Sequence, residues 1–147
     1  MARWRFAAAL AFGMLVPTAA MADDAISIAR AWVRPTLGTL KVTAGYLTIT
    51  NSGASDDALL SVTAPGIGRI EMHASVESDG VVSMRRQETI AIAAGGTLVL
   101  APGGRHLMLM GVDPALKTGA TLPLTLIFAH HPPITIEAPV RMTTPEP

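Results

Sequence analysis

The sequence contains no cysteine among its 147 residues. This absence excludes disulfide bonds, thiolate metal ligands and a lipidated cysteine. It also excludes a blue-copper electron-transfer centre, which needs a cysteine thiolate beside two histidines. The chain must therefore be stabilised by its hydrophobic core alone, and any soft metal ligand in it has to be a methionine thioether or a histidine imidazole.

Charged and aromatic residues are also scarce, at 15% and 4%, and the formal net charge is zero. No run of lysine or arginine indicates nucleic acid or an anionic membrane surface as a partner. No Ser/Cys–His–Asp arrangement, phosphate-binding loop or carboxylate pair stands out, so we do not expect an enzyme.

The N-terminal residues 1–22 have the pattern of a signal peptide. Arg3 and Arg5 precede a short apolar run, Phe6–Val16, and a small-x-small cleavage pattern follows. The apolar run is too short to span a bilayer comfortably. We therefore expect a cleaved leader, no stable membrane association, and one secreted domain over residues 23–147.

The remaining chain shows short β-branched segments separated by glycine, proline, asparagine and aspartate, without a useful helical period. This pattern is typical of a β-sandwich or barrel, and we expect an all-β sandwich. A single helical turn is expected within Asp113–Gly119. The predicted strands are Ile26–Arg34, Ala44–Thr50, Leu59–Thr63, Arg69–Ser75, Val81–Arg86, Thr97–Leu100, His106–Met110, Thr121–Phe128 and Ile134–Val140.

A two-residue turn at Asp79-Gly80 predicts the pairing of the strands on either side of it. Counting outward from this turn places Ser75 opposite Met84. His73 and Met84 then lie on one face as diagonal neighbours, roughly 7–8 Å apart at the backbone. Their side chains can converge on one ion, provided that the register is not shifted by one residue.

Alternation within the first of these strands assigns the neighbours of His73 to two faces. Arg69 and Glu71 share the polar face with His73, whereas Met72 falls on the apolar face. Met72 is therefore expected in the core and not at a metal. Glu71 and Glu77 share the face of His73, where they either orient its imidazole or lie in solvent.

A second candidate segment is His106-Leu-Met-Leu-Met110, which suits a strand better than a helix. In a strand, His106, Met108 and Met110 face one way, while Leu107 and Leu109 face the core. His106 and Met108 thus offer two ligands on one surface. Met110 is either a weaker outer ligand or a space-filling residue.

Two imidazoles and two thioethers, from His73, Met84, His106 and Met108, form a donor set that suits Cu(I) better than Zn(II). The alternative is that the methionines fill the core and that the histidines only form hydrogen bonds. The chain would then be a metal-free secreted adhesion or assembly module. His130-His131 is either a weak second site for Cu(II) or Zn(II) or, as we expect, a solvated turn.

The spacing of these ligands resembles a known family. His73, Met84, His106 and Met108 match the H-x10-M-x21-H-x-M signature of the periplasmic PCu(A)C-type copper chaperones. The likeness extends from about Ile26 to Val140. It includes the segments Ala31-Trp-Val-Arg34, Ala44-Gly-Tyr-Leu-Thr-Ile-Thr-Asn51 and Pro102-Gly-Gly-Arg-His-Leu-Met-Leu-Met-Gly111.

This resemblance implies a cupredoxin-like Greek-key β-sandwich with a surface-exposed Cu(I) site. It further implies a monomer in the periplasm that delivers copper to the Cu(A) centre, in subunit II of cytochrome c oxidase, together with a Sco-type protein. Some relatives bind Cu(II) through a C-terminal extension rich in histidine and methionine. The tail of this chain holds only Met142, so a second site of that kind is not expected.

Overall fold

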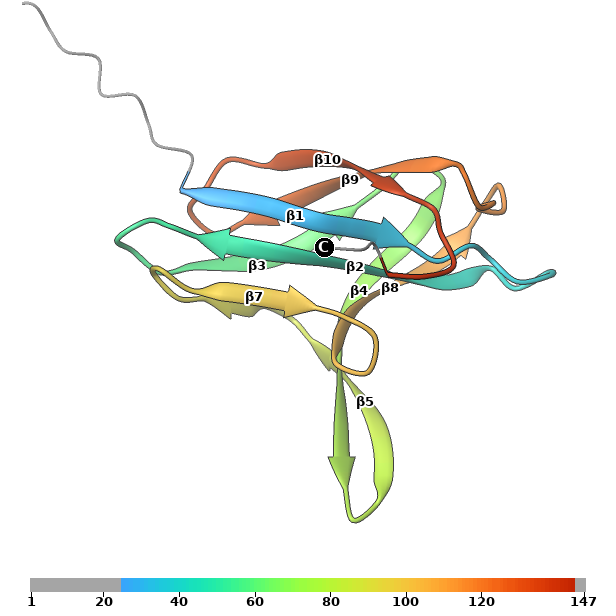
Figure 1. The fold of residues 1–147 in the computed structure, drawn as a ribbon, viewed down its shortest axis with the longest axis horizontal. Helices are drawn as coiled ribbons and strands as arrows, with labels where there is room; N and C mark the ends of the chain where they lie inside the picture. The colour runs from blue at the N-terminus through green and yellow to red at the C-terminus, as the bar shows by residue number, and fades with distance from the viewer. Residues whose placement is uncertain (1–24, 145–147) are drawn as a thin grey trace, which may run out of the picture.

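The computed structural model describes residues 25–144, and the expected signal peptide lies outside this range. Ten strands form two packed sheets (Figure 1). They are β1 (Ile26–Val33), β2 (Val42–Asn51), β3 (Asp57–Thr63), β4 (Ile67–Ser78), β5 (Val81–Gln87), β6 (Ile90–Ile92), β7 (Thr97–Leu100), β8 (Arg105–Val112), β9 (Thr121–Phe128) and β10 (Ile134–Pro139).

The larger sheet has six strands in the order β1-β2-β8-β4-β5, with β7 paired to β2. The smaller sheet has the order β10-β9-β3-β6. Alternate residues of both sheets fill the space between them, as in other β-sandwiches. Leu107 and Leu109 of β8 are fully buried there, as are Leu124 and Leu126 of β9. The outward face of β8 is therefore free to carry polar and sulfur-containing side chains.

All nine predicted strands are present, with ends that shift by up to three residues. The three-residue strand β6 was not predicted, because it is too short to show alternation. The helical turn expected within Asp113–Gly119 was wrong. The backbone there bonds to distant segments instead: the amide of Asp113 donates to the carbonyl of Gly66, and that of Thr36 donates to Leu116. No helix within residues 25–144 is long and apolar enough to cross a membrane.

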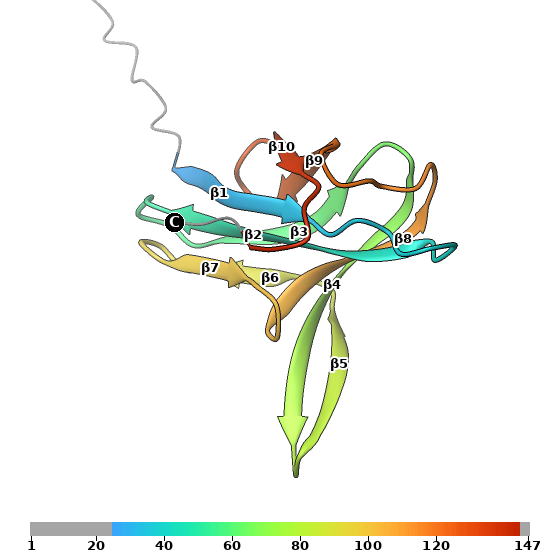
Figure 2. The ribbon, with the colours of Figure 1, turned by 45° about the vertical axis from the view of Figure 1, so that its right-hand side comes forward.

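The β4–β5 hairpin projects from the body of the sandwich (Figure 2). Asp79 and Gly80 form its turn, with φ angles of 52° and 75°. Two consecutive positive φ angles are the mark of a type I′ turn, whose twist matches that of the flanking strands. The register is the predicted one, with Ser75 opposite Met84 and His73 opposite Arg86.

Candidate metal centre

Strand pairing places the two predicted histidine ligands side by side. His73 of β4 lies directly opposite His106 of β8, and their ring centroids are 5.7 Å apart. This contact joins residues that are 33 positions apart in the sequence, 106 minus 73. The antiparallel register of two central strands thus creates the nitrogen half of the candidate site.

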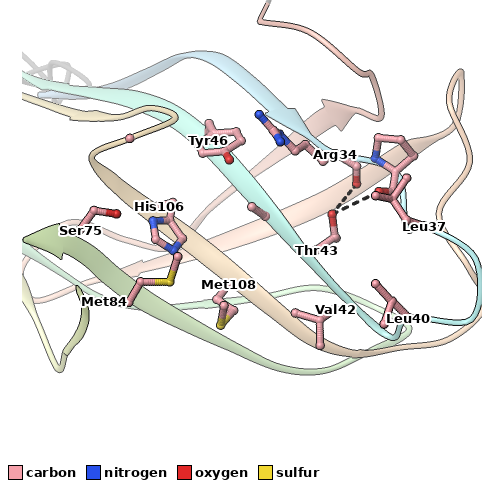
Figure 3. Close-up of a pocket in the computed structure, with 13 residues that line it drawn as sticks. Arg34, Leu37, Leu40, Val42, Thr43, Tyr46, Ser75, Met84, His106 and Met108 are labelled. Carbon is pink, nitrogen blue, oxygen red and sulfur yellow. Dashed lines mark hydrogen bonds between the residues drawn. The ribbon is translucent and has the colours of Figure 1, made fainter. Parts of the chain in front are cut away.

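The two predicted thioether ligands flank this pair of rings. Met84 lies on β5, on the other side of β4, and Met108 lies two residues beyond His106 on β8. Met84, His106 and Met108 line one hollow of about 300 Å³. Figure 3 shows the side chain of Met84 reaching toward the imidazole of His106. The sulfur atoms and the imidazoles therefore belong to one face of three adjacent strands.

The candidate ligands differ in exposure. His106 is only 6% exposed, whereas Met84 is 59% exposed. His106 lies on a central strand beside Tyr46, while Met84 lies on the edge strand β5. One end of the site is consequently enclosed by the sandwich, and the other end is open to solvent.

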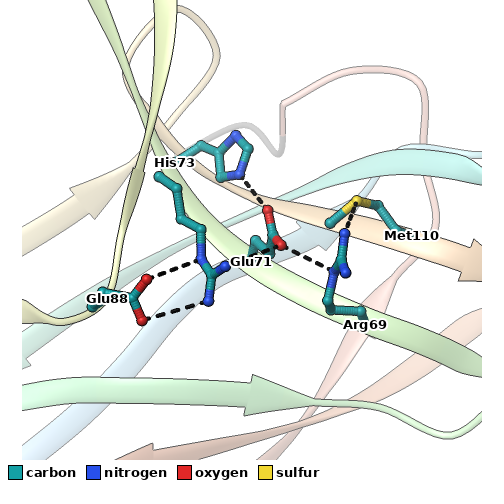
Figure 4. Close-up of polar contacts among 6 residues, drawn as sticks. Arg69, Glu71, His73, Glu88 and Met110 are labelled. Atoms are coloured by element: carbon teal, nitrogen blue, oxygen red, sulfur yellow. Dashed lines mark hydrogen bonds and ion pairs between the residues drawn. The ribbon is translucent and has the colours of Figure 1, made fainter.

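The ring of His73 is held by a carboxylate on its own strand. Nε2 of His73 lies 2.9 Å from Oε2 of Glu71 (Figure 4). The other carboxylate oxygen of Glu71 lies 3.0 Å from Nε of Arg69 and 3.7 Å from Nη1 of Arg86. The hydrogen bond from His73 lowers the pKa of Glu71; partial desolvation opposes this shift, and the two arginines reinforce it. Glu71 thus orients an imidazole, one of the two roles expected for it.

The second ring nitrogen of His73 has a different environment. Nδ1 is buried and has no hydrogen-bond partner among residues 25–144. A buried polar atom without a partner is unfavourable, and such atoms in native proteins often mark a place where an ion or a water binds. In His106 the roles are reversed, since Nδ1 lies 3.2 Å from the carbonyl oxygen of Gly104. Each imidazole therefore has one nitrogen engaged by the protein and the other without a hydrogen bond to it.

The other methionines of this region do not share the hollow. Met72 is 5% exposed and belongs to the core, as predicted. The sulfur of Met110 accepts a hydrogen bond of 3.5 Å from Nη2 of Arg69, and this exposed bond lies outside the hollow. Met84 and Met108 are therefore the methionines that share the hollow with His106, whereas Met72 packs in the core and Met110 contacts Arg69.

Tyr46 of β2 and residues of the loop after β1 also border the hollow. The rings of Trp32 and Tyr46 stack at 4.7 Å, and the guanidinium of Arg34 lies 6.0 and 5.9 Å from their centroids. Tyr46 and Arg34 line the hollow together with Leu37. No pairing signal in the sequence connects the loop after β1 with β8, so this wall was not foreseen.

The His130-His131 segment forms a turn and not a second cluster of ligands. The backbone amides of His130 and His131 each donate to the carboxylate of Asp57, at 3.0 Å. Desolvation raises the pKa of Asp57, but these bonds and one from Ala58 outweigh it and lower the pKa. Nowhere in residues 25–144 do three His, Cys, Asp or Glu side chains gather for a metal.

Two relatives share moderate sequence identity with this chain. A protein of Leifsonia xyli subsp. xyli with a lipoprotein description is 29% identical over 119 residues, which are 80% of this chain and 70% of that protein. An uncharacterized protein of Rickettsia prowazekii is 29% identical over 111 residues, or 73% of this chain and 61% of that protein.

Solved structures support the same fold. The Cu(I)-bound form of DR1885 from Deinococcus radiodurans is 28% identical, with a TM-score of 0.66 and coverage of 84% of this chain and 83% of that one. The copper-bound PCuAC domain of PmoF2 has a TM-score of 0.70 at 24% identity, with coverage of 81% and 94%. These likenesses confirm the predicted PCu(A)C family and β-sandwich, and they agree with the expectation that the protein is not an enzyme. The family model described as "Putative lipoprotein LpqE-like" matches residues 26–140, and the chain belongs to this family.

Proposed function

We propose that the protein is a copper chaperone that binds Cu(I) through His73, Met84, His106 and Met108. The observation that supports this most directly is that two imidazoles and two thioethers lie on one face of β4, β5 and β8. His73 and His106 are side by side there, and Met84, His106 and Met108 line one hollow. The unpartnered Nδ1 of His73 gives a second reason, because a bound cation would satisfy it. The relatives DR1885 and PmoF2, solved with copper, make this metal the first choice.

The donor set favours Cu(I) over harder ions. Thioether sulfur is a soft, neutral ligand, and Cu(I) tolerates low coordination numbers and does not require ionised ligands. Zn(II) normally recruits thiolate, imidazole or carboxylate in a tetrahedron, and this site lacks a thiolate. The carboxylate of Glu71 contacts His73, but its oxygen atoms are occupied by this histidine and two arginines.

Transfer of the ion would occur by ligand exchange and not by catalysis. Met84 is 59% exposed, and the neighbouring apolar residues Leu37 and Leu40 are each 62% exposed. A partner can therefore approach from the open end of the site and displace the sulfur of Met84 first. The buried imidazole of His106 would hold the ion until a second donor of the partner engages it.

The compartment and the recipient follow from the family resemblance. We propose a periplasmic monomer, residues 23–147, released by cleavage of the signal peptide at residues 1–22. Its recipient would be the Cu(A) site in subunit II of cytochrome c oxidase, with a Sco-type protein as a second partner. An apolar, accessible rim around the exposed thioether is consistent with transient contact to such a partner.

The test is Cu(I) loading of the purified protein under reducing conditions, followed by X-ray absorption spectroscopy and a competition titration. We expect one Cu(I) per chain and a ligand shell that contains both nitrogen and sulfur. Failure to retain Cu(I) at micromolar concentration would favour the metal-free adhesion or assembly module. A shell with nitrogen and oxygen only would contradict the thioether assignment while leaving metal binding intact.

A further inference from the structure

The side chain of Glu71 divides its two oxygen atoms between different partners. One oxygen contacts the guanidinium groups of Arg69 and Arg86, and the other forms its polar contact within residues 25–144 with Nε2 of His73. Arginine is always protonated and can only donate hydrogen bonds. The arginines therefore occupy one end of the carboxylate, and its other end faces the histidine ring (Figure 4).

An ionised carboxylate can only accept hydrogen bonds. Nε2 of a neutral His73 must therefore carry the ring proton in order to donate it across the 2.9 Å contact with Glu71. Neutral imidazole carries one proton, so Nδ1 then keeps a free lone pair. This is the buried nitrogen without a hydrogen-bond partner.

We infer that Glu71 is a positioning residue that selects the Nε2–H tautomer of His73 and thereby presents Nδ1 as its copper-binding nitrogen. This inference rests on the proposed copper function. His106 would bind through the opposite nitrogen, Nε2, because its Nδ1 contacts the carbonyl of Gly104. The two histidines of the site would thus coordinate through different nitrogen atoms.

A purely structural role for Glu71 is the competing explanation, because its ion pairs with Arg69 and Arg86 also join β4 to β5. The substitution Glu71→Gln separates the two roles. Glutamine has the shape of glutamate, but it has a single carbonyl oxygen. This oxygen faces the arginines, because they can only donate hydrogen bonds. The amide group then faces His73 and donates to Nε2, which forces the proton onto Nδ1.

The first measurement uses the copper-free protein and ¹⁵N-labelled histidine. Nitrogen chemical shifts at about pH 8, where free imidazole is neutral, report which ring nitrogen of His73 carries the proton. We expect Nε2–H in the wild type, Nδ1–H in Glu71→Gln and a mixture in Glu71→Ala. The inference would be overturned if wild-type His73 carried its proton on Nδ1, or if neither substitution changed the tautomer.

The second measurement is Cu(I) affinity by competition titration. Loss of the partner that orients a metal-binding histidine typically costs about 10–100-fold in affinity, and we expect this loss in Glu71→Gln. Glu88→Gln is the matched control, since Glu88 pairs with the same Arg86, whereas the carboxylate that contacts His73 is that of Glu71. Its affinity should stay within about threefold of the wild type, less than the 10–100-fold of an orienting partner.

The outcomes distinguish this inference from the proposed function. If the wild type binds no Cu(I), the proposed function fails, whereas the tautomer result remains valid by itself. If the wild type binds Cu(I) and Glu71→Gln binds it equally well, the positioning role is wrong. Cu(I) is diamagnetic, so nitrogen shifts of the loaded protein also show which nitrogen of His73 binds; copper on Nε2 would overturn the inference.

Discussion

Met84 and Met72 provide a direct test of which sulfur atoms belong to the proposed copper site. Met72 is adjacent to His73 in the sequence but lies in the core, whereas Met84 is eleven residues away, 84 minus 73, and faces the hollow. Replacing either one by leucine removes the thioether and nearly conserves volume. We therefore expect both variants to fold, with stability losses below about 1.5 kcal/mol.

The two leucine variants should differ in copper binding. Met84→Leu removes a proposed ligand, and we expect its Kd for Cu(I) to rise at least about tenfold, which corresponds to about 1.4 kcal/mol. Met72→Leu should leave the Kd unchanged. The assay is a competition titration with a chromophoric Cu(I) chelator under reducing conditions. Equal affinities for the two variants would refute the assignment of Met84.

Alanine at the same two positions should affect stability in the opposite order, with the larger loss at Met72. Met72 is 5% exposed, so Met72→Ala leaves a cavity and should cost about 2–5 kcal/mol of unfolding free energy. Met84 is 59% exposed, and Met84→Ala should change stability by no more than about 0.5 kcal/mol. Urea denaturation of the copper-free variants measures both values. A large loss in Met84→Ala would mean that this side chain also supports the hairpin.

Three further predictions concern pH and the backbone. The loaded protein should release Cu(I) as the pH falls below about 6, because protons compete for the imidazole ligands; constant occupancy down to about pH 4 would contradict imidazole ligation. Asp57→Asn should lower the free energy of unfolding near neutral pH. Because the folded pKa of Asp57 is lowered, this loss relative to wild type should shrink as the pH falls below the ordinary pKa of 3.8. Urea denaturation near neutral pH and below pH 3.8 measures the loss, and an equal loss at the two pH values would contradict the prediction. Gly66→Ala should lower the melting temperature more than Gly80→Ala. Both glycines have positive φ, but only at Gly66 would a Cβ lie 2.7 Å from the carbonyl oxygen of Asp113. Equal melting temperatures of the two variants would show that the loop at Gly66 relaxes.

The sequence was most informative where local rules determine the pairing. The Asp79-Gly80 turn fixes the β4–β5 register, so the position of Met84 relative to His73 was predictable by counting. Alternation correctly assigned Leu107 and Leu109 to the core and His106 to the opposite face. These two inferences defined the candidate ligands, yet neither could show that β8 pairs with β4.

The burial of His106 depends on long-range pairing, and the contacts of Glu71 depend on side-chain rotamers. His106 is covered because β8 lies between β2 and β4, which brings Tyr46 beside it. Glu71 meets Arg86 because β5 pairs with β4, in the register that the Asp79-Gly80 turn sets. Sequence alternation placed Arg69, Glu71 and His73 on one face, but it could not indicate which oxygen serves which partner. Such contacts involve side-chain rotamers, and alternation carries no information on these.

The proposed ligands lie on strands that differ in how many neighbours they pair with, and this difference matters for the proposed transfer of copper. His106 and Met108 lie on β8, which is bonded to neighbours on both sides, and His73 lies on β4, which is paired with both β8 and β5. Met84 lies on β5, which pairs with β4 alone. Edge strands with exposed hydrogen bonds open at lower free energy than central strands. In the proposed transfer, displacement of Met84 by an incoming ligand would therefore disturb the edge strand β5. The two imidazoles would keep their positions on the central strands and retain the ion until the partner has engaged it.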